Sequence, residues 1–218
     1  MTPPQFHKSD GIEDWRVLGE GACAFFPTPS FAASARLVQA IAALPGFDNH
    51  APDVDIRHDG VTVRLITITA DYYGMTRRDV ERARQISAVA REQGVSAEPS
   101  AVQTVLVIPG APVTARVMPF WRAILGYQPR CDSPDEDLVD PHRRGPAFWF
   151  ESMKESRAGG GGSIHVCIYV PHDQAAARIA AALAAGGRLV RDEFAPAWWT
   201  LADAVGNECD IATTMTGD

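Results

Sequence analysis

The sequence predicts an α+β protein made of two domains. Its 218 residues fit two domains of about 100 residues each. The first half alternates short strand patterns with amphipathic helix patterns, and the second half contains one strand–helix–strand pattern twice. Between them, residues 92–100 carry Gly, Ser and Pro and are predicted to connect the domains. The predicted domains are residues 9–95 and 101–216.

The first elements are a hairpin and a helix. Residues 15–18 and 22–27 read as two strands around the turn residues 19–21. Ser30 is a good N-cap for the helix that follows, and Pro45-Gly46 ends it. The apolar stripe of this helix is predicted from residues at helical spacing, which are Phe31, Ala35, Val38 and Ala42.

A second hairpin and a second helix complete the first domain. Asp59-Gly60 is a strong hairpin dipeptide, and the alternation after it places Val61, Val63 and Leu65 on one face of a strand. Thr76 and Asp79 have the spacing of a capping box. The helix they open carries an apolar stripe of Val80, Ala83, Ile86, Val89 and Ala90. The predicted order of this domain is ββαββα.

The second domain is predicted to be a repeat. Residues 102–109 parallel residues 164–171, and each strand is followed by a helical stretch and a glycine turn. Later strands, near residues 138–151 and 201–212, also correspond, so the unit is βαβββ used twice. Gly159-Gly160-Gly161-Gly162 is predicted to be a flexible linker, because no Lys-Ser/Thr pair follows it as in a phosphate-binding loop.

Composition and charge exclude several classes of function. The net charge is −7 with no basic cluster, which argues against binding DNA or RNA. No apolar run approaches the roughly 18 residues that span a bilayer. The start of the chain lacks the pattern of a secretory signal, so a cytoplasmic location without membrane association is expected. Four scattered cysteines argue against a zinc knuckle and against a disulfide framework.

The segment from residue 49 to residue 79 resembles the pterin-4a-carbinolamine dehydratase family. The resemblance depends on Asn49-His50-Ala51-Pro52-Asp53, the strand at 61–68, and the capped helix after Gly74. Members of that family use three histidines, two before the proline and one that closes the strand. This chain keeps His50, whereas Ala51 and Ile68 occupy the other two positions.

This resemblance implies a hydro-lyase site. Dehydration of a 4a-hydroxytetrahydropterin needs an acid for the departing hydroxyl and a base for the ring N–H, and imidazoles titrate in the right range. His50 is the candidate acid–base group, and His58 is a candidate to supplement it. Asp53 matches a polar position that would bind the substrate. The alternative is that His50 is only a turn residue. The dehydratase-like reaction requires no cofactor.

The second domain resembles the glyoxalase and vicinal-oxygen-chelate superfamily. The match is carried by Leu125-Gly126-Tyr127 and by the segment from Trp198 to Glu208. Metal-binding members take ligands from the first and last strands of each repeat, and the matching positions here are Gln103, Glu151, His165 and Asp210. Such a set would accept a divalent metal. A metal-free domain remains the alternative, with Trp149, Trp198 and Trp199 either lining a pocket for a flat ligand or serving as core.

Three functions follow as hypotheses. The leading one is a hydro-lyase related to 4a-hydroxytetrahydrobiopterin dehydratase, with activity impaired by the loss of two histidines. The second is a metal-dependent lyase, isomerase or dioxygenase acting on a small molecule in the second domain. The third is a non-catalytic binding or dimerisation protein. Both resemblances imply a small-molecule substrate and a homodimer or larger homo-oligomer.

Overall fold

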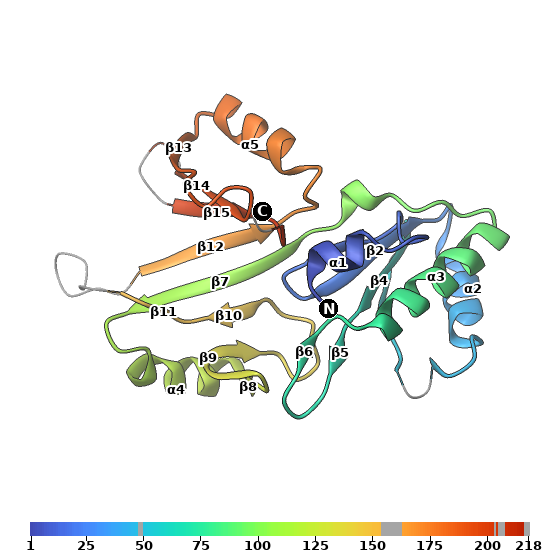
Figure 1. Cartoon of the computed structure of the whole chain (residues 1–218), viewed down its shortest axis with the longest axis horizontal. Coiled ribbons are helices and arrows are strands. Elements are labelled where there is room, and N and C mark those ends of the chain that lie inside the picture. Colours follow the sequence, from blue (N-terminus) through green and yellow to red (C-terminus); the bar gives the residue numbers. More distant parts are fainter. Residues whose placement is uncertain (48–49, 154–162, 203, 205–207, 216–218) are drawn as a thin grey trace. The chain divides into compact units, whose positions relative to one another are not determined.

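The computed structural model divides the chain into two compact units (Figure 1). It describes all residues except 48–49, 154–162, 203, 205–207 and 216–218. Unit 1 contains residues 1–68, 74–103 and 171–174, and unit 2 contains residues 69–73, 104–170 and 175–218. The predicted glycine linker at 159–162 lies outside the described residues. The first unit starts before the predicted boundary at residue 9, because it includes a short helix, α1, at Pro3–His7.

Unit 1 is an antiparallel sheet with two long helices on one face. The strand order is β1-β2-β4-β3, and the helices are α2 and α3. Strand register places Ala22, Ala24 and Phe26 opposite Leu65, Val63 and Val61, and all six are buried against the helices. The bounds of these elements are β1 Arg16–Leu18, β2 Gly21–Pro27, α2 Phe31–Ala42, β3 Asp53–Ile56, β4 Gly60–Leu65 and α3 Arg77–Glu92.

The predicted ββαββα order is confirmed, and its two helix starts are formed as expected. Ser30 accepts a hydrogen bond from the backbone N–H of Ala33, and Asp79 accepts one from the backbone N–H of Thr76. A short β5–β6 hairpin, with β5 at Thr67–Ile68 and β6 at Tyr73–Gly74, was not predicted.

The predicted apolar stripe of α2 is wrong at three of its four residues, whereas Val38 packs partly buried against the core. Phe31 is 57% exposed, and Ala35 and Ala42 are also exposed. The helix instead buries Ser34, Leu37 and Ile41. Ser34 fits this face because its hydroxyl contacts Thr28 and donates to the backbone oxygen of Arg57, so a polar residue at helical spacing belongs to the buried side.

Unit 2 is one large mixed sheet built from two βαβββ repeats, as predicted. The strand order is β13-β14-β15-β12-β7-β10-β9-β8, and β11 also pairs with β7. The first strands of the two repeats, β7 and β12, are antiparallel neighbours at the centre. The first repeat contains β7 Thr104–Ala111, α4 Thr114–Leu125, β8 Gln128–Arg130, β9 Ser133–Val139, β10 Ala147–Trp149 and β11 Glu151–Ser152. The second contains β12 Ser163–Tyr169, α5 Ala175–Ala184, β13 Arg188–Arg191, β14 Trp198–Ala202 and β15 Glu208–Ala212.

The two faces of this sheet differ. Helix α4 packs on a cluster around Leu138 and Phe148, and α5 packs on a cluster around Leu201 and Ile211. Side chains of alternate residues point to the opposite face, which we call the open face because neither helix covers it. A smaller buried group on that face contains Ile108, Cys167 and Ala212.

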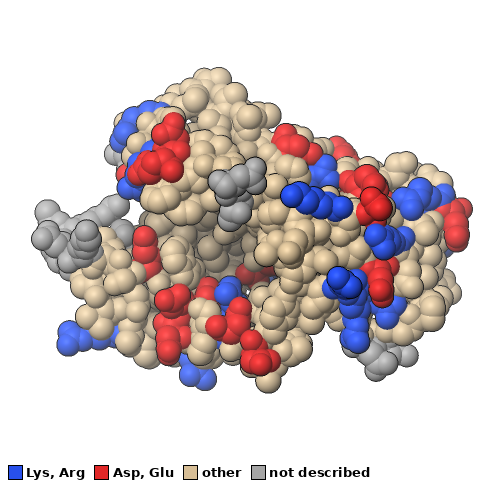
Figure 2. Space-filling model, in the orientation of Figure 1, with Lys and Arg blue, Asp and Glu red and all other residues tan. Residues whose placement is uncertain are grey.

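The surface agrees with the charge pattern of the sequence. On the face shown in Figure 2, the described acidic and basic side chains are interspersed and form no broad basic patch. Within the described part of the chain, every helix is too short or too polar to span a bilayer.

Candidate functional sites

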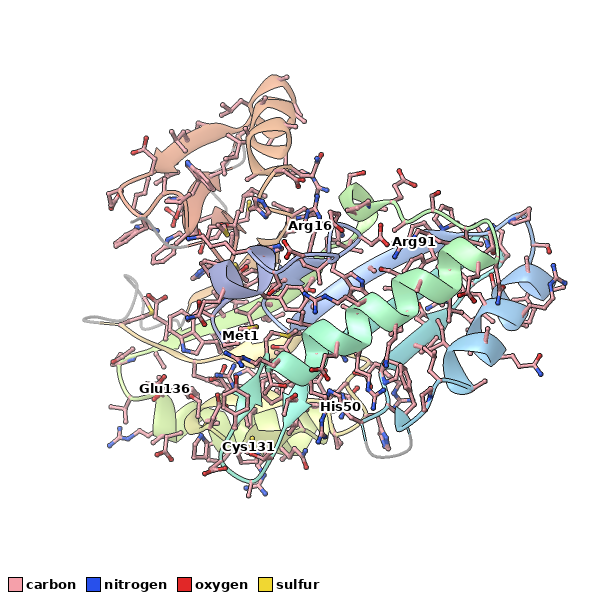
Figure 3. All side chains as sticks on the ribbon, turned by 45° about the vertical axis from the view of Figure 1, so that its right-hand side comes forward. Met1, Arg16, His50, Arg91, Cys131 and Glu136 are labelled. Atoms are coloured by element: carbon pink, nitrogen blue, oxygen red, sulfur yellow. The ribbon has the colours of Figure 1, made fainter. Side chains whose placement is uncertain are left out.

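His50 in unit 1 is held by a buried carboxylate. Its Nε2 atom lies 2.8 Å from Oδ1 of Asp79, and only 11% of the imidazole side chain is exposed. Asp79 is in the first turn of α3 and is fully buried. Figure 3 shows His50 beside the N-terminal end of this helix. The backbone N–H of His50 also donates to the backbone oxygen of Phe47.

The other oxygen of Asp79 is saturated by local donors. Oδ2 accepts hydrogen bonds from the Thr76 backbone N–H at 2.7 Å and from the Thr76 hydroxyl at 2.8 Å. It also accepts from the Thr67 hydroxyl at 2.7 Å. Since a buried carboxylate needs such donors, these threonines fix its position. The carboxylate therefore connects strand β5, the start of α3 and His50.

This arrangement assigns different roles to the two imidazole nitrogens. Asp79 acts as an acceptor, so Nε2 of His50 carries the proton that it donates. Within the described residues, Nδ1 has no hydrogen-bond partner. Nδ1 is therefore the nitrogen that is left to accept or return a proton.

The two other predicted residues of this unit lie elsewhere. His58 is in the turn between β3 and β4, where its side chain is 90% exposed beside Asp59. It lies beyond the far end of β3 from His50, so the structure does not bring these imidazoles together. Asp53, at the start of β3, is bound by the guanidinium of Arg64 at 2.9 Å. Its role in substrate binding stays a prediction.

The two positions without histidine directly follow residues that bind Asp79. Ala51 follows His50 directly and is exposed, and Ile68 follows Thr67 and is 40% exposed. Because His50 and Thr67 both bind Asp79, residues 51 and 68 are each one position from a ligand of that carboxylate. Both side chains are exposed to solvent.

A second imidazole–carboxylate pair lies on the open face of unit 2. Nε2 of His165 is 3.2 Å from Oδ2 of Asp210, and Oδ1 of Asp210 accepts a hydrogen bond from the Thr200 hydroxyl at 2.7 Å. Strand register produces this arrangement, since Asp210 pairs with Cys167 on one side and with Thr200 on the other. The hydrogen bond to Asp210 raises the pKa of His165, opposed by partial burial and helped by the nearby charges of Asp210, Glu151 and Glu208.

The predicted metal ligands do not assemble into one set. Ile108 of β7 is the strand partner of His165, whereas Thr104 pairs with Tyr169. Gln103 precedes Thr104 and so is five residues from the partner of His165, a distance of about 17 Å in extended chain. Glu151 pairs with Gly110 on β7, and its charge is felt at His165.

The donors that do meet are a poor fit for a divalent metal. Among the described residues, no three His, Cys, Asp or Glu side chains are grouped to hold an ion. His165 and Asp210 instead bind each other, while a protein metal site usually has at least three protein ligands. Metal binding by Gln103, Glu151, His165 and Asp210 therefore stays a prediction without support from this geometry.

The three tryptophans separate by face. Trp199 packs in the cluster under α5 and is core. Trp149 and Trp198 lie in register with residues of the open face, and each is 36% exposed. Trp198 also stacks on Phe194, with ring centroids 4.4 Å apart.

Comparisons with known proteins agree with these two folds. Residues 4–89 match the family model described as pterin 4 alpha carbinolamine dehydratase, and residues 103–212 match the glyoxalase-like domain. A Nocardia farcinica protein named "Putative pterin-4-alpha-carbinolamine dehydratase" is 38% identical over 80 residues, which cover 37% of this chain and 82% of the relative. The chain belongs to the pterin 4 alpha carbinolamine dehydratase family, with a glyoxalase-like domain joined to it.

Other similar proteins each cover only part of the chain. A Mycobacterium leprae protein of the same dehydratase name is 35% identical over 34% of this chain and 78% of its own length. A glyoxalase/bleomycin resistance protein/dioxygenase superfamily member from Vibrio splendidus covers 51% of this chain and 99% of its own, with 13% identity and a TM-score of 0.34. A Legionella pneumophila structure titled NAD-dependent benzaldehyde dehydrogenase covers 50% of this chain and 97% of its own, with 15% identity and a TM-score of 0.37.

Sequence reasoning missed two of the residues that organise the sites. Asp79 was predicted only as a helix cap. In the structure it also binds His50, which is 29 residues earlier in the sequence. Thr200 carried no signal apart from its place in the segment from Trp198 to Glu208. Both histidines were identified from the sequence, and so was the Thr76 cap on Asp79, but the hydroxyls of Thr67 and Thr200 were not.

Proposed function

We propose that unit 1 is a hydro-lyase that dehydrates a 4a-hydroxytetrahydropterin. Family membership supports the reaction class, and the observation that carries the proposal is the 2.8 Å contact between His50 and the buried Asp79. This contact leaves one imidazole nitrogen available for proton transfer. The proposal extends the dehydratase name of the relatives to a chain that retains one of the three family histidines.

One imidazole is sufficient for the proton balance of this reaction. Nδ1 of His50 accepts the ring N–H proton, and the resulting imidazolium returns a proton to the departing hydroxyl. The C–O bond breaks, a C=N bond forms, and water leaves with no net change in the protonation of the enzyme. Each missing acid–base group lowers the rate by about 10²–10⁴-fold, so we expect turnover to be slow.

Restoring the histidines is the sharpest test. The variants Ala51→His and Ile68→His, singly and together, should raise kcat/KM for 4a-hydroxytetrahydropterin by about a hundredfold or more, and His50→Ala should abolish turnover in every background. His58→Ala is the matched control and should change nothing, because His58 is exposed at the far turn. If the wild type and the double histidine variant both fail to dehydrate the pterin, the proposed function is wrong.

A second candidate function resides in unit 2. The His165–Asp210–Thr200 group on the open face, with Trp149 and Trp198 on the same face, supports binding or conversion of a small molecule. The test combines elemental analysis of purified protein with calorimetric screening of small aromatic and oxygen-rich ligands. If the wild type binds a ligand but contains no metal, and His165→Ala loses that binding, a metal-free site is supported. If the wild type contains stoichiometric metal that His165→Ala loses, the chelate mechanism is supported. Saturable binding without product supports a non-catalytic role.

We also propose that the protein is a cytoplasmic homo-oligomer. Strand β3 is at the edge of the unit 1 sheet, and its Val54 is 36% exposed. An uncovered edge strand favours pairing with another chain. Light scattering on the purified protein should give at least twice the mass of one chain, and a monomer at micromolar concentration would contradict this.

A further inference from the structure

The loop that carries His50 is held to α3 at two points. Asp79 binds the imidazole itself, and Arg82, three residues later on the same face of the helix, binds the beginning of the loop. Nη1 of Arg82 donates to the backbone oxygen of Pro45 at 2.8 Å, and Nη2 donates to that of Gly46 at 2.7 Å. Residues 48 and 49 lie between these contacts and outside the described chain.

Arg82 also covers the next residue of the loop. Its guanidinium carbon lies 4.4 Å from the centre of the Phe47 ring, and Phe47 is buried in the core of unit 1. The backbone oxygen of Phe47 accepts the N–H of His50 at 3.1 Å. A continuous set of contacts therefore leads from Arg82 through Phe47 to the backbone of His50.

Two features show that the chain accommodates this guanidinium closely. Gly46 has a φ of +76°, and a Cβ added there would lie 2.8 Å from Nη2 of Arg82, so glycine is needed for the approach. The Nε atom of Arg82 is buried and has no hydrogen-bond partner among the described residues. A buried donor without a partner destabilises the fold. Arginine is needed here because only its planar guanidinium can bind two carbonyl oxygens and stack on an aromatic ring at once.

We propose that Arg82 is a positioning residue for His50. It fixes residues 45–47 and thereby sets the place of the imidazole against Asp79, so that Nε2 is bound and Nδ1 is presented. The inference rests on the proposed dehydratase function for its catalytic consequence. Its structural content, the ordering of the His50 ring, is independent of that function.

Arg84 provides a matched control on the same helix. Its Nε donates to the backbone oxygen of Asp10 at 2.7 Å, so it also holds a loop through a carbonyl, but that loop does not carry His50. Arg82→Met removes two hydrogen bonds to loop carbonyls, and Arg84→Met removes one. A general loss of stability should affect both variants, whereas misplacement of His50 should appear only in the first.

The decisive measurement is the nitrogen-bound proton of the His50 ring in NMR spectra of the full chain. In the wild type and in Arg84→Met, the Nε2–H bonded to Asp79 should give a resonance protected from solvent exchange. In Arg82→Met this resonance should broaden or vanish. If it is unchanged in Arg82→Met, the proposal is overturned, whether or not the protein turns over a pterin.

Kinetics then test the catalytic consequence. In the double histidine background that restores turnover, Arg82→Met should lower kcat by about tenfold with little change in KM, and Arg84→Met should stay within about twofold. An equal loss of kcat in both arginine variants would overturn the proposal. If Arg82→Met does not fold, Arg82→Lys and Gly46→Ala serve the same measurements, since each disturbs the fork without removing the charge.

Discussion

Both units contain an imidazole bound to a carboxylate that a threonine hydroxyl supports, on two unrelated folds. In unit 1, Asp79 is fully buried and accepts four hydrogen bonds, three of them from Thr67 and Thr76. In unit 2, Asp210 is 8% exposed and receives Thr200 and His165. The first carboxylate is part of the architecture of a helix start, and the second lies on a sheet face. The carboxylate of unit 1 therefore contributes to folding as well as binding the imidazole, whereas the carboxylate of unit 2 forms no part of a helix start.

The largest predicted difference concerns the two carboxylates. Asp79→Ala leaves buried donors without acceptors and should lower the free energy of unfolding by about 3 kcal/mol, whereas Asp210→Ala should cost about 1 kcal/mol. Hydrogen exchange by mass spectrometry separates the units, and α3 peptides should exchange faster in the first variant. Equal costs, or a larger cost for Asp210→Ala, would show that burial does not distinguish the pairs.

A smaller difference is expected in acid, and it concerns His7 of unit 1. Burial, and then the charges of His172 and Arg16, lower the pKa of His7 to about 4 from 6.5. Above pH 6.5 the ring is neutral in both the folded and the unfolded state. As the pH falls from 6.5 to about 4, only the unfolded chain gains the proton, so stability should fall by about 1–2 kcal/mol after allowance for the exposed part of the ring.

The variant His7→Gln tests this expectation, because glutamine does not titrate and can still accept the N–H of Val17, which His7 accepts through Nε2. Urea denaturation at a series of pH values should show a shallower loss of stability in the variant than in the wild type. Parallel curves would assign the acid sensitivity to other groups.

The smallest effect has the opposite sign and belongs to unit 2. Because the hydrogen bond to Asp210 raises the pKa of His165 above 6.5, its stabilising contribution is complete below pH 6.5 and is lost as the pH rises through the raised value. NMR titration in the presence of a chelator should give a midpoint above 6.5 for His165, and Asp210→Asn should lower it. A midpoint at or below 6.5 in the wild type would mean that the pair is not formed in solution.

The sequence was sufficient for the fold because local signals agreed with one another. Each signal had a short-range physical cause. These signals were the hairpin turn at Asp59-Gly60, the helix caps at Ser30 and Thr76, and the duplicated strand pattern. The stripe of α2 was wrong because a serine with its own hydrogen-bond partners took a buried position, and a count of apolar residues does not register that.

The sites were predictable only as far as single residues carry a signal. His50 and His165 are identifiable because an imidazole in a matching motif position is uncommon. Asp79 as the partner of His50, and Arg82 as the support of its loop, arise from the packing of α3 against a loop some 30 residues earlier. Gln103 was assigned by sequence correspondence between the repeats, whereas the antiparallel register of β7 and β12 determines which residues face each other.

The double duty of Asp79 has a consequence for how such a protein changes over generations. A lineage that abandons the chemistry still needs this carboxylate to begin α3, while side chains at the exposed positions 51 and 68 are free to drift. The exposed histidines of the site would thus be lost first, and the buried pair of His50 and Asp79 would be lost last.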